Sequence, residues 1–167
     1  MSSRPRIKIV PDDMDKRIRA LSVILFLLMT AFTCWLYDIS PDKVPGHFDI
    51  NGNINRYDNK ITVFIMPMIA LVILLLLNFL TRIPHIYNYP QSITAETAPA
   101  MYKAGAKMLR YLCLGLMLLF CYIQYEMYIG IRDKYLPMHW WELVLVLLLT
   151  TVLPIIISIK GFRGRKK

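Results

Sequence analysis

Long runs of uncharged, apolar residues constrain this chain more than any other feature. Residues 20–37 form 18 consecutive positions without a charged side chain, and further apolar runs cover residues 61–80, 109–131 and 140–159. A helix of about 20 residues crosses a hydrocarbon layer of about 30 Å, and a helix satisfies its own backbone within lipid. The sequence therefore predicts an all-α integral membrane protein with four transmembrane helices.

Composition supports a membrane protein and argues against a nucleic-acid-binding one. Apolar residues make up 56% of the 167 positions, which is high for a soluble domain. The net charge of +9 comes from basic residues beside the apolar runs, not from a basic face. All three cysteines lie within these runs, so we expect no disulfide framework. We expect the lipid bilayer as surroundings, no nucleic-acid partner and no cofactor.

The first apolar run also has the basic start and apolar core of a signal peptide. Residues 30–37 read TAFTCWLY, which offers neither a small-x-small cleavage site nor a lipoprotein box before Cys34. We therefore expect this run to be a retained helix.

Lysine and arginine counts predict the direction of the spans. Fifteen Lys and Arg residues lie in three segments: the basic N-terminal segment 1–19, the connection between the second and third spans (counted through Arg110), and the tail 160–167. The two other connections together hold five. Because alternate segments share one side and basic loops remain in the cytoplasm, both termini are predicted to be cytoplasmic. The tail is expected to lie against anionic headgroups. The predicted location is the cytoplasmic (inner) membrane of a bacterium, crossed several times.

The connection after the second span is predicted to be irregular as far as Ser92. His85 is interpreted there as an ordinary loop histidine. Thr97 followed by Pro99 indicates the start of a helix, which we expect to run from about Ala98 through Ile131 with its first turns outside the hydrocarbon.

The stretch KVPGHFDINGNINRYDNK, residues 43–60, is a dense polar block between two apolar runs. Asp49, Asn51, Asn53 and Asn55 alternate like the first calcium ligands of an EF-hand, but Ile54 and Lys60 stand where that loop needs Gly and Glu. Asn51-Gly52 is also a strong tight-turn signal. A structural turn and a calcium site of other geometry both stay open.

A second polar group is expected at the same outer rim. Glu126, His139 and Glu142 lie near the outer ends of the third and fourth spans. With His47 they have the side chains of a zinc site or a proton relay. The alternative is that the two carboxylates pair with Arg56, Lys60, Arg132 or Lys134 in an interfacial network of ion pairs. Tyr122, Tyr125 and Tyr128, with Trp140 and Trp141, are typical of an interfacial aromatic belt.

The polar block resembles the motif of the bacterial membrane family called domain of unknown function 1648. That motif has a Pro, a His-Phe-Asn, a Gly, an Asp-Arg and a closing Lys between two transmembrane helices. The matching residues are Pro45, His47, Phe48, Gly52, Arg56 and Lys60. Asp49 replaces the usual Asn, Asn55 the usual Asp, and Asp58 a small residue. The resemblance covers most of Ile24 to Tyr125, within a family-like region taken as residues 20–131.

This resemblance implies a role without established chemistry. The domain also occurs in longer SdpI-type immunity proteins, which protect bacteria against a secreted membrane-active toxin. We therefore expect a non-enzymatic protein of immunity, signalling or envelope stress, whose outer loop meets a peptide toxin or another ligand. Two alternatives remain: a small transporter or metal-dependent membrane enzyme using His47, Glu126 and Glu142, and a structural subunit bound to a membrane-protein partner.

Overall fold

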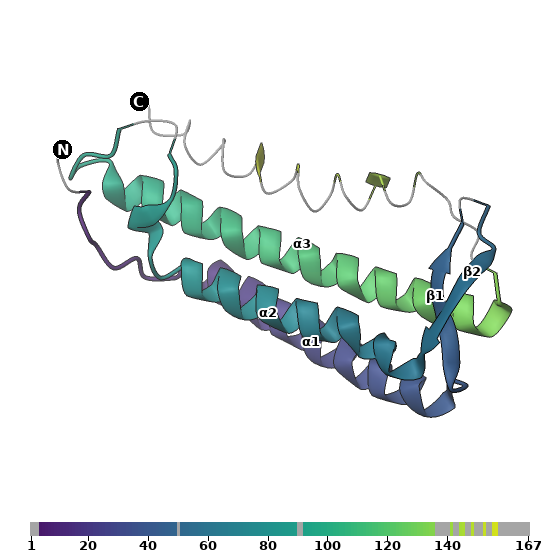
Figure 1. Cartoon of the computed structure of the whole chain (residues 1–167). Coiled ribbons are helices and arrows are strands. Elements are labelled where there is room, and N and C mark those ends of the chain that lie inside the picture. Colours follow the sequence, from purple (N-terminus) through teal and green to yellow (C-terminus); the bar gives the residue numbers. More distant parts are fainter. Residues whose placement is uncertain are drawn as a thin grey trace.

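The computed structural model describes residues 4–49, 51–89 and 92–135, and seven single positions between 141 and 156. Three long helices lie side by side, and a β-hairpin crosses the bundle at the end opposite the N-terminus (Figure 1). The elements are α1 (Asp13–Ile39), β1 (Lys43–Phe48), β2 (Ile54–Asn59), the 3-10 helix η1 (Lys60–Phe64), α2 (Ile65–Leu80), the 3-10 turn η2 (Pro84–Ile86) and α3 (Ala98–Asp133).

α1 begins before the predicted span because its first turn carries a capping box. The Asp12 side chain accepts a hydrogen bond from the Asp15 backbone N–H at 2.9 Å, and the Asp15 side chain accepts one from the Asp12 N–H at 3.1 Å. These two contacts satisfy backbone donors that have no partner within the helix. The helix therefore starts at Asp13, although charged residues fill its first two turns.

The long third helix has the predicted start. Thr97 is its N-cap residue, and Pro99 lies in the first turn, where its missing N–H costs little. The 36 residues of α3 span about 54 Å at 1.5 Å per residue, which exceeds the hydrocarbon thickness. Lys134, with a φ of 54°, adopts the left-handed conformation and ends the helix.

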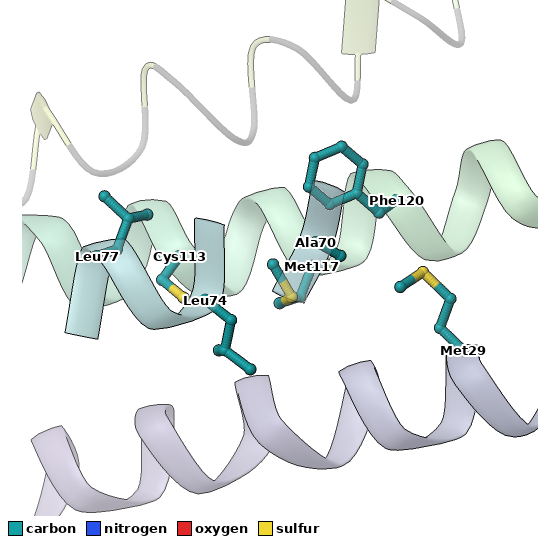
Figure 2. Packing of buried hydrophobic residues seen from close by; sticks show 7 residues of the cluster. All are labelled: Met29, Ala70, Leu74, Leu77, Cys113, Met117 and Phe120. Carbon is teal, nitrogen blue, oxygen red and sulfur yellow. The ribbon is translucent and has the colours of Figure 1, made fainter. Parts of the chain in front are cut away.

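The three helices share one apolar core. Figure 2 shows its residues, which are contributed by α1 (Met29), α2 (Ala70, Leu74, Leu77) and α3 (Cys113, Met117, Phe120). Ala70 is fully buried, and its small side chain lets α2 approach α3 closely. Hydroxyl groups inside the bundle are satisfied within their own helix: Ser22 donates to the Ile18 carbonyl at 2.9 Å and Thr33 to the Met29 carbonyl at 2.8 Å.

The outward faces of the helices are apolar as well. On α2, Met68, Val72 and Leu75 are 66%, 64% and 61% exposed. Such a surface is unfavourable in water but matches lipid tails. Three described helices, Asp13–Ile39, Lys60–Leu80 and Ala98–Asp133, are long and apolar enough to cross a membrane. Most of the predicted fourth span, residues 140–159, lies outside the described residues, as does the tail 160–167.

The expectation of an all-α chain is wrong for residues 43–59. Residues 43–48 and 54–59 form the antiparallel pair β1 and β2, so the predicted polar outer loop between the first two spans contains a β-hairpin. The chain is nevertheless mostly helical.

The segment of residues 4–12, called here the N-terminal arm, packs across the opposite end of the bundle. Arg4 donates hydrogen bonds to the carbonyls of His85 and Tyr87 at 3.2 and 2.5 Å. The Tyr102 hydroxyl on α3 donates to the Pro5 carbonyl at 3.0 Å. Ile7 and Ile9 pack against a small apolar cluster at the start of α3. The arm thus links the α2–α3 connection to α3.

Candidate functional site

The hairpin turn is held by one aspartate. Asp49 Oδ1 accepts hydrogen bonds from the backbone N–H groups of Asn51 and Asn53, both at 2.9 Å, and Oδ2 accepts one from the Asn53 side chain at 3.3 Å. The Asn53 backbone N–H is the largest cause that holds the pKa of Asp49 below its usual value. Gly52, which lies within this turn, has a φ of 85°, a left-handed conformation that glycine adopts readily. Since both carboxylate oxygens already accept hydrogen bonds, the arrangement favours the structural turn over a calcium site.

Two irregularities shape the hairpin around His47. Pro45 pairs with Tyr57, His47 with Arg56 and Phe48 with Ile54, so Gly46 and Asn55 are each an extra residue on their strand. Such bulges redirect side chains and increase the local twist. The exposed His47 ring Nδ1 lies 2.7 Å from the Asn55 side-chain oxygen. Because an amide oxygen only accepts, Nδ1 carries the proton and donates it. Asn55 therefore fixes the orientation of the imidazole.

Arg56 and Asp58 form an ion pair beside this histidine. Arg56 Nη2 lies 2.9 Å from Asp58 Oδ2 and also donates to the Gly46 carbonyl at 3.1 Å. A Cβ atom at Gly46 would overlap the Asp58 carboxylate, so only glycine permits this close approach. Asp58 thus supplies a negative charge to Arg56.

Phe48 anchors the hairpin on the bundle. Its ring lies against Gly130 of α3, where a Cβ atom would overlap the ring Cζ. On the same strand, Val44 and Pro45 are buried. The aromatic residue of the His-Phe motif therefore docks the hairpin on α3, while His47 remains exposed on the other side of the pleat.

Lys60 joins the base of the hairpin to α1. Its ammonium lies 3.7 Å from Asp42 Oδ1 and 4.7 Å from the centre of the Tyr37 ring, and its backbone N–H donates to the Asp42 carbonyl at 3.0 Å. The closing lysine of the motif thus contacts both a carboxylate and an aromatic face. Its position explains why the motif ends where the second membrane helix begins.

The predicted aromatic belt includes residues that the sequence reasoning did not assign to it. Tyr125 and Tyr128 of α3 lie with ring centres 6.3 Å apart, and Tyr128 also contacts Phe32 and Trp35 of α1 at 6.0 and 5.6 Å. Arg132 lies above the Tyr128 ring at 5.5 Å. The described part of the belt therefore joins α1 to α3 near the hairpin end.

Only one of the predicted outer-rim partners can be placed. Glu126 lies on α3 one helical turn before Gly130, hence on the face that meets Phe48. His139 and Glu142 lie outside the described residues. Within residues 4–49, 51–89 and 92–135, no three His, Cys, Asp or Glu side chains gather in a manner suited to a metal ion. Two cations expected in the alternative network, Arg56 and Lys60, form ion pairs with Asp58 and Asp42, whereas the predicted pairs were with the carboxylates of the outer rim, so that network stays a prediction.

Several residues that build the site were missed in the sequence. Gly46 and Gly130 are small because side chains from other elements fill their space, and Gln124, which is fully buried, donates to the Val63 carbonyl at 3.3 Å. Glycine near the end of a long helix and glutamine within an apolar run were the available signals.

The fold and the hairpin define a mostly helical membrane protein with an anchored polar hairpin between its first two long helices. Residues 24–71 match the model of the family described as Domain of unknown function (DUF1648). The match spans the second half of α1, the hairpin and the first part of α2. The resemblance inferred from the His-Phe motif is thereby confirmed for this segment. No curated protein and no solved structure matches the chain.

Proposed function

We propose that the chain is a non-enzymatic protein of the bacterial cytoplasmic membrane whose hairpin binds a membrane-active peptide outside the cell. The proposed topology has both termini in the cytoplasm, in keeping with the excess of Lys and Arg at the N-terminal end of the bundle. The role would be immunity, signalling or the response to envelope stress.

The observation that carries this proposal is an exposed recognition surface on an anchored hairpin. His47 and Arg56 form a cross-strand pair and are both exposed. Arginine is among the residue types that contribute most to binding at protein interfaces. Because Phe48 is docked on Gly130 and the turn is fixed by Asp49, little ordering would be required on binding.

Charge indicates which peptides would suit this surface. Arg56 lies opposite His47 and is only partly neutralised by Asp58. A carboxylate of the ligand would complete the contacts of Arg56, while the second ring nitrogen of His47, whose Nδ1 donates to Asn55, would accept a hydrogen bond from the ligand. The hairpin carboxylates Asp42, Asp49 and Asp58 each already contact a cation or a backbone N–H, which favours binding over acid–base chemistry.

Survival of a deletion strain under a membrane-active peptide tests the proposal. His47→Ala and Arg56→Ala should abolish protection while the protein still reaches the membrane fraction in normal amount. His47→Asn keeps a donor for Asn55 but removes the second ring nitrogen, so it should also fail if that nitrogen meets the ligand. Lys43→Ala, which removes an exposed cation from the same strand, is the matched control and should protect fully. Full protection by His47→Ala and Arg56→Ala would refute the proposal.

A further inference from the structure

A groove opens at the end of the bundle opposite the hairpin. It has a volume of about 930 Å³ and is bordered by the N-terminal arm, the first turns of α1, the last turns of α2 and one residue of α3. This volume lies in the range of sites for small molecules. The family match begins at residue 24, so most of this end lies outside it.

Positive charge dominates the groove. One carboxylate, that of Asp15, faces five cationic side chains: Lys8, Lys16, Arg19, Arg82 and Arg110. Lys16 pairs with Asp13 at 2.9 Å. For Lys8, Arg19 and Arg82, no ion pair occurs among residues 4–49, 51–89 and 92–135. The groove therefore has an excess of cations that suits an anion.

A buried ion pair at the inner wall of the groove contains polar atoms that lack a hydrogen-bond partner among the described residues. Arg110 Nη1 lies 3.3 Å from Asp15 Oδ2, and the two side chains are 7% and 0% exposed. Despite this contact, Arg110 Nη1 and Asp15 Oδ1 have no hydrogen-bond partner in the described part of the chain. A buried guanidinium N–H without an acceptor is unfavourable. Because Arg110 lines the groove, an oxygen atom of a ligand would supply that acceptor.

The groove changes character along the bundle axis. Apart from Ile9 and Pro11 of the N-terminal arm, its apolar side chains are Val23 of α1 and Leu74 and Leu75 of α2, which lie farther from the N-terminal end than Arg19 and Arg82. The cations at the rim would suit an anionic lipid headgroup, and the apolar side chains nearer the bilayer centre would suit an acyl chain.

We propose that this groove binds a phosphate-bearing anion, with the phosphate between Arg19, Arg82 and Arg110. The apolar wall favours an anionic phospholipid, whose acyl chain would lie along Val23 and Leu75, over a free phosphate compound. This site is independent of the hairpin and of any ligand bound there. It would hold a single lipid headgroup at the end of the protein that carries the N-terminal arm.

Lipid retention by the full-length chain tests the proposal. The protein is purified in a mild detergent with an equal mixture of phosphatidylglycerol and phosphatidylcholine, and bound lipid is counted by native mass spectrometry. Wild-type protein should retain phosphatidylglycerol preferentially. Arg19→Gln/Arg82→Gln should weaken this retention about thirtyfold, since each of the two basic residues near an anionic headgroup contributes about 1 kcal/mol.

Matched variants distinguish lipid binding at a specific site from a general effect of positive surface charge. Arg6→Gln/Arg17→Gln removes two exposed cations from the same end that do not line the groove, and it should change retention less than about twofold. Arg19→Lys/Arg82→Lys preserves charge and should retain most of the binding. Equal losses in the groove variant and the Arg6/Arg17 control would overturn the proposal, as would equal retention of both lipids by the wild type.

A second experiment distinguishes a lipid phosphate from a free phosphate compound. Inorganic phosphate is titrated against the thermal stability of delipidated protein, with chloride at equal ionic strength as reference. Stabilisation by phosphate that is absent in Arg19→Gln/Arg82→Gln would assign the site to free phosphate compounds, whereas retention of phosphatidylglycerol without a phosphate response assigns it to lipid. Neither response in the wild type would refute the site.

Discussion

Replacing Gly130 with alanine tests how the hairpin is held against α3. The new Cβ would overlap the Phe48 ring, so the ring and its strand must move. Overpacking of this kind costs about 1–3 kcal/mol. The same substitution in a helix interior contributes about 1 kcal/mol of stability through helix propensity. The net effect in the wild-type background should therefore lie between about zero and 2 kcal/mol of destabilisation.

A double-mutant cycle isolates the contact from helix propensity. A Phe48→Ala background removes the ring atoms that lie nearest to the new methyl group, so there Gly130→Ala should stabilise the protein by about 1 kcal/mol. The measurements are reversible unfolding in mixed micelles and hydrogen exchange of the hairpin amides. Exchange should accelerate in Gly130→Ala and in Phe48→Ala, with no further acceleration in the double variant. An identical stability change in both backgrounds would refute the anchoring of the hairpin by Phe48.

Three other substitutions test separate parts of the fold. Arg110→Ala should cost about 3–5 kcal/mol, because it leaves the buried Asp15 charge uncompensated, and Asp15→Asn in the same chain should restore part of that loss in an unfolding titration. Gly52→Ala should cost about 1–2 kcal/mol at its left-handed φ, while Gly52→Asn should cost less, as measured by thermal unfolding. The hydrogen bond from the Asp15 backbone N–H, together with Lys103, lowers the pKa of Asp12. The contribution of the Asp12 carboxylate to stability is therefore fully present above the usual aspartate pKa and is lost as the pH falls through the lowered pKa. On acidification into that range, the wild type should therefore lose more stability than Asp12→Asn, and parallel pH profiles would contradict this.

The helices could be predicted from the sequence to different degrees. The apolar runs are strong signals because lipid requires long helices, and Thr97 with Pro99 identified the start of α3. The start of α1 was missed because charged residues surround it, although Asp12 and Asp15 have the spacing of a capping box. The fourth span and the orientation of the chain in the membrane stay predictions.

The hairpin was harder to predict than the helices. Asn51-Gly52 indicated its turn, but Pro45 and the bulges at Gly46 and Asn55 break the alternation by which a strand is recognised. The resemblance to the family motif singled out side chains such as His47 and Phe48 without indicating what each one contacts. The docking of Phe48 on Gly130 joins residues far apart in the chain, and local sequence patterns do not encode such a contact.

The N-terminal arm has a consequence for biosynthesis. The hydrogen bond from Tyr102 to the Pro5 carbonyl joins residues separated by 97 positions, so the arm leaves the ribosome well before its docking partner on α3, the last of the three long described helices. The arm must therefore wait, undocked, until α3 has been translated and inserted. Protection of the arm from an added protease would consequently mark the completion of assembly, and nascent chains that end before α3 would lack it.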